Sequence, residues 1–219
     1  MIRTKNLKKS YKSIQVLKGV DLNIAESEIV SIVGASGAGK TTLLQILGTL
    51  DAPSNDNCQL LIDNTDILKL EQNELSKFRN TNIGFIFQFH QLLPEFTALE
   101  NVCIPGYIKK RGKNEIESRA KELLSYLDLD KKLHNKPNEL SGGEQQRVAV
   151  ARALINDPKV IFADEPSGNL DSVSADNLYK LFFDIRSKYN TTFIIVTHNE
   201  KLANLADRKI EITDGIINK

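Results

Sequence analysis

Glycines, a lysine and a threonine follow one another at positions 34–41 in the order Gly-Ala-Ser-Gly-Ala-Gly-Lys-Thr. A β-branched apolar run at 28–33 precedes this string and an aliphatic stretch to residue 50 follows it, which predicts a strand, a loop and a helix in that order. Glycines allow successive backbone N–H groups to converge on one point, and the following helix directs its positive end there. The string therefore predicts a phosphate-binding loop within an α/β fold.

This loop assigns roles to individual side chains. Lys40 is expected to reach the β- and γ-phosphates of a nucleotide, and the Thr41 hydroxyl to ligate Mg²⁺. A glycine-rich turn with a chance lysine is the alternative, but the flanking strand and helix count against it. The predicted nucleotide contacts are Gly34, Ala35, Ser36, Gly37, Ala38, Gly39, Lys40, Thr41 and Thr42.

Short apolar runs alternate with amphipathic stretches over most of the chain. Strands are expected at 28–33, 83–87, 160–163 and 193–196, and a helix at 172–189. This alternation predicts a parallel core sheet. Two regions depart from it: residues 1–25 resemble antiparallel strands, and residues 97–140 look all-helical. We expect one domain over residues 1–219, with an α-helical subdomain inserted at roughly 89–157.

Composition excludes several classes of protein. The 29 basic and 28 acidic residues nearly cancel, so no global charge favours nucleic acid. Cys58 and Cys103 form neither a disulfide framework nor a metal cluster, which indicates a reducing compartment. The basic start leads into no apolar run, so no signal peptide is expected, and the longest aliphatic runs fall far short of the ~20 residues that span a bilayer.

Two carboxylates end the predicted strand at 160–163. Asp164 is placed to hold Mg²⁺, and Glu165 to polarise the water that attacks the γ-phosphate. A solvated strand end before the turn at Pro166 is the alternative, and the phosphate loop favours the catalytic interpretation. A general base for water also argues against kinases of small metabolites, where a second substrate accepts the phosphoryl group.

A second glycine motif, Leu-Ser-Gly-Gly-Glu-Gln-Gln-Arg, occupies 140–147, ahead of a helical stretch at 148–155. Ser141 and Glu144 have the spacing of a helix capping box. That explanation leaves out Gly142 and Gly143, which permit close approach of an anion to the backbone. A second phosphate site in a chain with one phosphate loop predicts a dimer in which this motif faces the partner's nucleotide.

Taken together, these motifs resemble the ordered set found in the nucleotide-binding domains of ABC transporters. The resemblance covers essentially the whole chain and rests on six motifs in order: 34–41, Gln88, 140–146, 161–165, 167–171 and 197–198. It implies the P-loop ABC ATPase fold, with ATP and Mg²⁺ as cofactors. It further places Ser141, Gly142, Gly143 and Glu144 against the partner's ATP.

The resemblance also implies roles that the residues alone do not give. Tyr11 would stack on adenine, and Gln88 would contact Mg²⁺ and the attacking water. Asp171 would lie across the dimer interface. His198 would contact the γ-phosphate and orient Glu165.

The segment from Gln88 to Val102 indicates which membrane subunits this chain would work with. It resembles the lipoprotein-releasing ATPases more than the macrolide-exporter or cell-division ATPases of the same subgroup, and Gly48 to Asp51 also fits that subgroup. Its apolar residues either dock onto membrane permease subunits, as the family implies, or fold inward onto the helical subdomain. The stretch 53–58 and Ser167 depart from the usual pattern without removing a catalytic group.

We therefore expect an ATP-hydrolysing subunit at the cytoplasmic face of a bacterial inner membrane. Through its permease subunits, it would power the extraction of lipoproteins, an indirect substrate. A macrolide- or peptide-exporter ATPase and a cell-division ATPase are the alternatives. An ABC protein acting on DNA is disfavoured because residues 42–139 contain neither sustained heptads nor a cysteine quartet.

Overall fold

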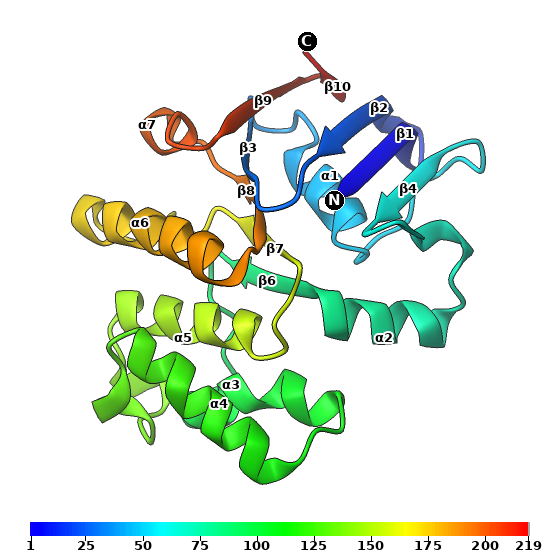
Figure 1. Ribbon diagram of the computed structural model, residues 1–219. Helices are drawn as coiled ribbons and strands as arrows, with labels where there is room; N and C mark the ends of the chain where they lie inside the picture. The colour runs from blue at the N-terminus through cyan, green and yellow to red at the C-terminus, as the bar shows by residue number, and fades with distance from the viewer. Residues whose placement is uncertain (219) are drawn as a thin grey trace.

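The computed structural model describes residues 1–218, and its centre is a six-stranded sheet (Figure 1). The strands from β9 to β6 pair in parallel, and β10 joins β9 antiparallel. Pairing aligns Asp164 with Phe87 on one neighbour and Val196 on the other, so the residues after these three strands meet at one edge of the sheet. The strand order is β10 (Ile216–Ile217), β9 (Arg208–Thr213), β3 (Ile29–Val33), β8 (Thr192–Val196), β7 (Val160–Asp164) and β6 (Ile83–Phe87).

Both faces of this sheet are buried because its strands alternate their side chains between two hydrophobic clusters. Phe162 and Ile194 pack toward the phosphate-loop helix and the N-terminal strands, whereas Ile161 and Phe193 pack toward the helical part of the molecule. Each such side chain contributes roughly 1.5–3 kcal/mol by leaving water. The helices around the sheet, apart from the helical part described below, are α1 (Lys40–Leu47), α2 (Gln72–Asn82), α6 (Ser172–Tyr189) and α7 (Glu200–Ala203).

A second, antiparallel sheet is formed by the N-terminal strands, drawn in blue and cyan beside α1 (Figure 1). Tyr11 pairs with Ile14 at the tip of its first hairpin, close to the phosphate-loop helix. The strand order is β2 (Ile14–Ile24), β1 (Ile2–Tyr11), β4 (Gln59–Ile62) and β5 (Thr65–Asp66).

The helical part lies on the opposite side of the central sheet from the N-terminal strands (Figure 1). Fully buried Ile116, Leu123 and Leu124 pack α4 against its neighbours. The predicted boundaries of a helical subdomain at 89–157 enclose these helices, and the division into subdomains stays a prediction. The elements are α3 (Ala98–Ile108), α4 (Lys113–Tyr126), short 3₁₀ turns at Asp130–Lys132 and Pro137–Glu139, and α5 (Gly142–Leu154).

The structure corrects several predicted boundaries. The phosphate-loop helix ends at Leu47 and not at residue 50, because Thr49 adopts a positive φ of 63°. Gly48 fits this helix end because a Cβ there would lie 2.4 Å from the Phe85 ring. The helix predicted at 148–155 begins earlier, at Gly142. Helix α2 and strands β4, β5 and β9 were not expected from the sequence.

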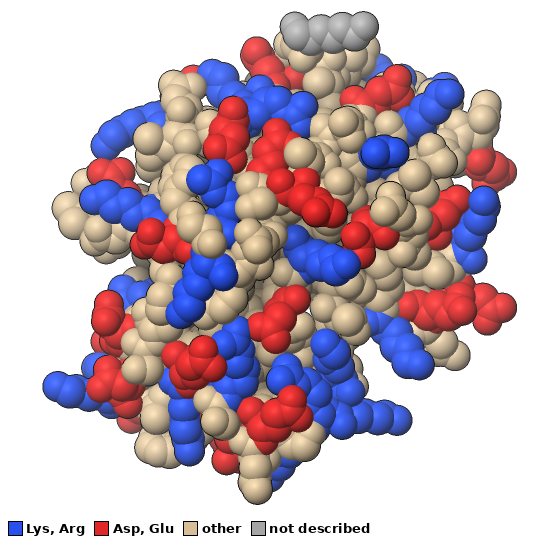
Figure 2. Space-filling view, in the orientation of Figure 1, with Lys and Arg blue, Asp and Glu red and all other residues tan. Residues whose placement is uncertain are grey.

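Charges of both signs are interspersed over the face shown in Figure 2, and neither sign covers a continuous field there. Helices in residues 1–218 are all too short or too polar to cross a bilayer.

Candidate functional site: a nucleotide-binding edge of the central sheet

The phosphate loop connects β3 to α1 with the backbone geometry that glycine permits. Gly34 has φ of 150°, and a Cβ there would lie 2.2 Å from the carbonyl oxygen of Ile212. Gly39, the residue before α1, has φ of 103°, and Gly37 has φ of 78°. Side chains are strained or excluded at these positions, so the three glycines shape the loop itself.

The mouth of this loop is prepared for an anion. No side chain caps the N-terminus of α1, and its first turn contains no acidic residue. Lys40 lies at the start of the helix, and its Nζ donates hydrogen bonds of 2.9 Å to the carbonyl oxygens of Gly34 and Ala35. Free helical N–H groups beside a positioned ammonium provide the electrostatics that a phosphate chain requires.

Asp164 ends β7 directly opposite this helix. Thr41 Oγ1 lies 3.4 Å from Asp164 Oδ1 and donates to it. Burial raises the pKa of Asp164, and the neighbouring charge of Glu165 raises it further. A carboxylate that is partly desolvated in this way gains from a nearby cation.

The oxygen atoms at this edge fit a magnesium ion. Thr41 and Asp164 supply a hydroxyl and a carboxylate that lie 3.4 Å apart. Gln88, which carries an amide oxygen, follows Phe87, the residue paired with Asp164. Mg²⁺ is bound through a few protein oxygens together with substrate phosphates. Among the described residues, no group of three or more His, Cys, Asp or Glu side chains is placed to hold a metal. Phosphate oxygens would therefore complete the coordination.

Glu165 and His198 form a pair beside Asp164. Glu165 has φ of 47°, and its amide donates to the carbonyl oxygen of Val196 across 2.9 Å. Its Oε2 lies 2.8 Å from His198 Nδ1 and 3.3 Å from the backbone nitrogen of His198. Contacts with both groups fix the carboxylate, whereas the imidazole itself is 72% exposed and free to contact a ligand.

Gln88 follows β6 and lies against the loop that follows Glu165. A Cβ on Gly168 would lie 2.8 Å from Gln88 Nε2, so glycine makes room for this amide. Asn169 Nδ2 donates to the backbone carbonyl of Gln88 across 2.9 Å. This contact could not be predicted from the sequence, because Gln88 and Asn169 lie 81 positions apart.

The second glycine motif lies on the helical part, away from α1 (Figure 1). Ser141 caps α5 by the predicted box: its hydroxyl accepts from the Glu144 amide, and Glu144 Oε2 accepts from the Ser141 amide across 2.7 Å. Gly142 is exposed, and a Cβ there would meet open space. The exposed backbone predicted for a phosphate is present, but it does not face Lys40 of the same chain.

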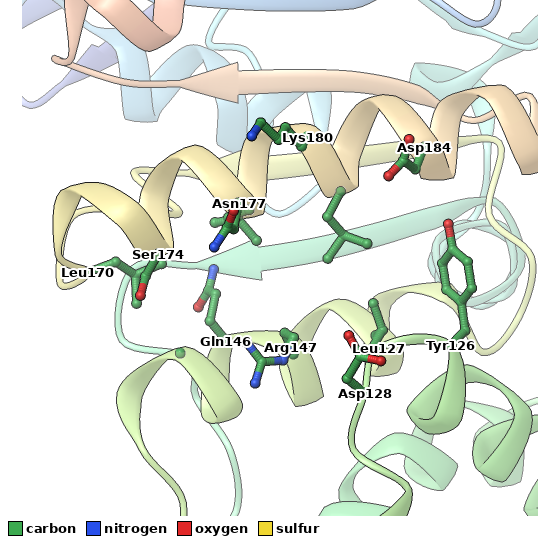
Figure 3. A pocket seen from close by; sticks show the side chains of 13 residues that line it. Tyr126, Leu127, Asp128, Gln146, Arg147, Leu170, Ser174, Asn177, Lys180 and Asp184 are labelled. Atoms are coloured by element: carbon green, nitrogen blue, oxygen red, sulfur yellow. The ribbon is translucent and has the colours of Figure 1, made fainter.

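Asp171 caps the neighbouring helix α6. Its carboxylate accepts from the backbone and hydroxyl of Ser174, and these hydrogen bonds lower the pKa of Asp171. A cleft of about 350 Å³ separates α6 from α5 (Figure 3). Gln146 Nε2 and Arg147 Nε, both buried at this cleft, have no hydrogen-bond partner within residues 1–218. Helix α5, which begins with the second glycine motif and is called the signature helix below, is therefore separated from α6 by a partly open cleft.

Tyr11 lies at the tip of the N-terminal hairpin with 45% of its surface exposed. Its hydroxyl donates to Asp51 Oδ2 across 2.6 Å. The ring is exposed, and its stacking on adenine stays a prediction. The Asp51 contact is one that the sequence did not reveal.

The segment after Gln88 presents exposed apolar side chains and is firmly held from beneath. Phe89, Leu93 and Phe96 are 74%, 44% and 41% exposed, while Leu92 packs onto the helical core. The buried Asn101 side chain donates to three backbone carbonyls of this segment and accepts from the Leu93 amide. Most of the apolar side chains of this segment thus face outward, one folds inward, and docking on permease subunits stays a prediction.

Comparison with known proteins gives a consistent result. A family model described as ABC transporter matches residues 17–168. The lipoprotein-releasing system ATP-binding protein LolD of Cytophaga hutchinsonii is 58% identical over 217 residues, covering 99% of this chain and 98% of that protein. LolD of Bacteroides thetaiotaomicron is 58% identical over 219 residues, covering all of both.

Solved structures agree with this similarity. The ATP-binding cassette MJ0796, in a dimeric post-hydrolysis state bound to ADP and Pi, superposes with a TM-score of 0.91 at 42% identity, covering 100% of this chain and 97% of that one. The structure of cbiO1 from Clostridium perfringens, part of a cbiONQ transporter complex, gives a TM-score of 0.90 at 28% identity, covering 100% and 86%.

Proposed function

Since this chain belongs to the ABC transporter family and is an ATP-binding, ATP-hydrolysing subunit, we propose that it powers the release of lipoproteins from a bacterial inner membrane. Full-length similarity to LolD proteins supports lipoproteins as the cargo. Hydrolysis is supported above all by the Glu165–His198 pair, which lies beside Asp164 and the phosphate loop.

We assign the steps of hydrolysis to this chain's own residues. The phosphate loop and Lys40 bind the triphosphate of ATP. Thr41, Asp164 and Gln88 would hold Mg²⁺, which would supply charge neutralisation on the phosphates. Glu165 accepts a proton from the attacking water, and His198 holds Glu165 in place while its exposed ring reaches the γ-phosphate.

Two copies act together in this proposal. Helix α1, which begins at Lys40, and helix α5, which Ser141 caps, lie in different parts of the molecule (Figure 1). A nucleotide bound by the phosphate loop therefore needs Ser141, Gly142 and Gly143 from a partner. ATP contacts both copies in the closed dimer and shifts the equilibrium toward it. Loss of the γ-phosphate removes the bridge and allows reopening.

Permease subunits dock on the outward-facing apolar residues Phe89, Leu93 and Phe96 at the cytoplasmic face of the membrane. A neighbouring groove of about 440 Å³ runs between β6, α3 and α5 and is lined by Phe85, Phe87, Ile108 and Arg152 among others. An apolar rim around a groove suits a short amphipathic helix of a membrane partner.

Purification of the Glu165→Gln variant from bacterial membranes in the presence of ATP tests this function. We expect permease subunits to co-purify, and the parental complex to release lipoproteins from proteoliposomes in an ATP-dependent manner. Recovery of an exporter or a cell-division partner, without lipoprotein release, would reject the proposed cargo. A Phe89→Ser variant serves as the control for docking: it removes an exposed docking residue far from the buried core, so it tests whether co-purification of the permease depends on this surface.

A further inference from the structure

Asp51 ends the Gly-Thr-Leu-Asp stretch that follows the phosphate-loop helix, and no step of the ATP cycle above uses it. This carboxylate is partly buried, and each of its oxygens has a strong donor. Tyr11 Oη donates to Oδ2 across 2.6 Å, and Lys9 Nζ donates to Oδ1 across 2.6 Å. The stretch therefore connects the end of α1 to the tip of the N-terminal hairpin.

Lys9 completes the arrangement on one side of the tyrosine. Its ammonium also donates to the carbonyl oxygen of Ala52 across 2.7 Å, and it lies 5.0 Å from the centre of the Tyr11 ring. The Lys9 side chain is 11% exposed, whereas Tyr11 remains 45% exposed. One face of the ring is thus occupied by a fixed cation and the rest of it is open to a flat ligand.

The path of the chain from α1 to Asp51 is also fixed. Gly48 packs against the Phe85 ring where no side chain would fit. Arg79 Nε donates to Thr49 Oγ1 across 3.0 Å, and an Arg79 Nη2 hydrogen bond holds the Thr49 carbonyl. The position of Asp51 relative to the phosphate loop is therefore set by packing and not by a free loop.

We propose that Asp51 is a positioning residue for the nucleotide base: it holds the Tyr11 ring at a set distance and angle from the phosphate loop, with Lys9 covering the ring's other face. The proposal rests on the assignment of this site to ATP. A ring held in advance loses less conformational freedom when the base stacks on it, so the contribution of Asp51 appears in affinity for the base. It does not appear in the chemistry at the γ-phosphate.

Binding measurements on purified protein test this assignment. We expect Asp51→Ala to weaken ATP binding roughly five- to tenfold, the scale of one ordinary hydrogen bond, and to raise KM without changing kcat at saturating ATP. Affinity for inorganic tripolyphosphate, which has no base, is expected to stay at the parental value. Asp56→Ala, on an exposed position of the same loop, is the charge-matched control.

A double-mutant cycle separates positioning from a general structural effect. In a Tyr11→Ala background, Asp51→Ala should cause no further loss of ATP affinity, because nothing is left to position. Asp51→Asn retains an oxygen that can accept from the tyrosine hydroxyl and is expected to recover most of the affinity.

Two results would overturn the assignment: parental ATP affinity in Asp51→Ala, or the same loss for ATP and tripolyphosphate. Failure of the underlying function looks different. In that case the parental protein itself would bind ATP and tripolyphosphate without distinction and hydrolyse neither.

Discussion

His90 Nδ1 donates a hydrogen bond to Oε1 of Gln146, joining the segment that follows Gln88 to the signature helix α5. Both side chains are buried, and burial lowers the pKa of His90. Arg152, also on α5, donates to the carbonyl oxygens of His90 and Gln91 across 2.7 and 2.6 Å. Three side-chain hydrogen bonds therefore join the proposed docking segment to α5, the helix that carries the proposed second phosphate site.

A His90→Ala variant tests the coupling that this contact predicts. It leaves the Gln146 oxygen unpaired and loosens the docking segment, while the residues around Lys40 and Glu165 are untouched. We expect ATP hydrolysis by the isolated subunit to stay within about twofold of the parent, and stimulation by assembled permease to fall about fivefold. His134→Ala, on an exposed histidine, is the control. Equal stimulation in both variants would contradict the prediction.

Glu165→Gln is expected to lower the hydrolysis rate at least 100-fold, because an amide cannot accept the proton from water. The triphosphate is then retained, so ATP should convert this variant from monomer to dimer in sedimentation experiments. His198→Ala should lose less activity than Glu165→Gln, since the backbone nitrogen of residue 198 still contacts the carboxylate. Hydrolysis at the parental rate in Glu165→Gln would exclude this residue as the base.

The motifs that could be predicted from the sequence are those whose chemistry is local. The loop at 34–41 and the box from Ser141 to Glu144 each contain their own hydrogen-bonding partners. Contacts such as Tyr11–Asp51 and Asn169–Gln88 join residues 40 and 81 positions apart, and no pattern in the chain marks them. They depend on how the hairpin and the strands are placed.

Secondary-structure elements also differ in how well the sequence predicts them. Strands β6, β7 and β8 were predicted to within one residue because each is a short, almost continuously apolar run: β7 and β8 are buried on both faces, and β6 is at least partly buried throughout. Helix α2 has no fully buried residue, and only Leu75 and Phe78 pack against the core, so its apolar stripe is too short to identify a helix from the sequence. Strand β9 buries Ile210 and Ile212 only on one face and is rich in charged residues, which conceals it in the sequence.

Magnesium binding should depend on pH through Asp164. Burial and the charge of Glu165 raise the pKa of this carboxylate, so it takes up a proton at a higher pH than an ordinary aspartate. Mg²⁺ affinity, measured by titration calorimetry with a non-hydrolysable ATP analogue, is expected to fall as the pH drops toward that raised pKa. An affinity independent of pH down to the ordinary range of aspartate would contradict this.

The same shift has a consequence for stability without metal. Because the folded-state pKa of Asp164 is raised, ionisation of this group costs stability, and the cost grows as the pH rises through that pKa. Asp164→Asn is therefore expected to raise the melting temperature of the metal-free protein at neutral pH and to abolish hydrolysis. A lower melting temperature would show that the carboxylate stabilises the fold.

Gly34→Ala should destabilise the protein severely, because the new Cβ would lie 2.2 Å from the Ile212 carbonyl oxygen at a φ of 150°. We expect a loss of more than about 3 kcal/mol in the free energy of unfolding, measured by urea denaturation. Gly37→Ala is the matched control: its φ is 78° but nothing lies within 4 Å of the new Cβ, so it should lose about 1 kcal/mol. Similar losses in both would mean that the contact with β9 is not tight.

Mixing two inactive variants tests whether each nucleotide is shared between copies. Lys40→Ala removes the phosphate-binding ammonium, and Gly142→Asp places a carboxylate where open backbone should meet the partner's phosphate, with space for the new side chain. Each variant alone is expected to be inactive. In a head-to-tail dimer of one copy of each, one site has both Lys40 and Gly142 intact and the other has neither. Equal mixing makes about half of all dimers mixed, so about one quarter of the parental sites and activity should return. Complete inactivity of the mixture, with mixed dimers demonstrated by a tag on one copy, would contradict the shared site.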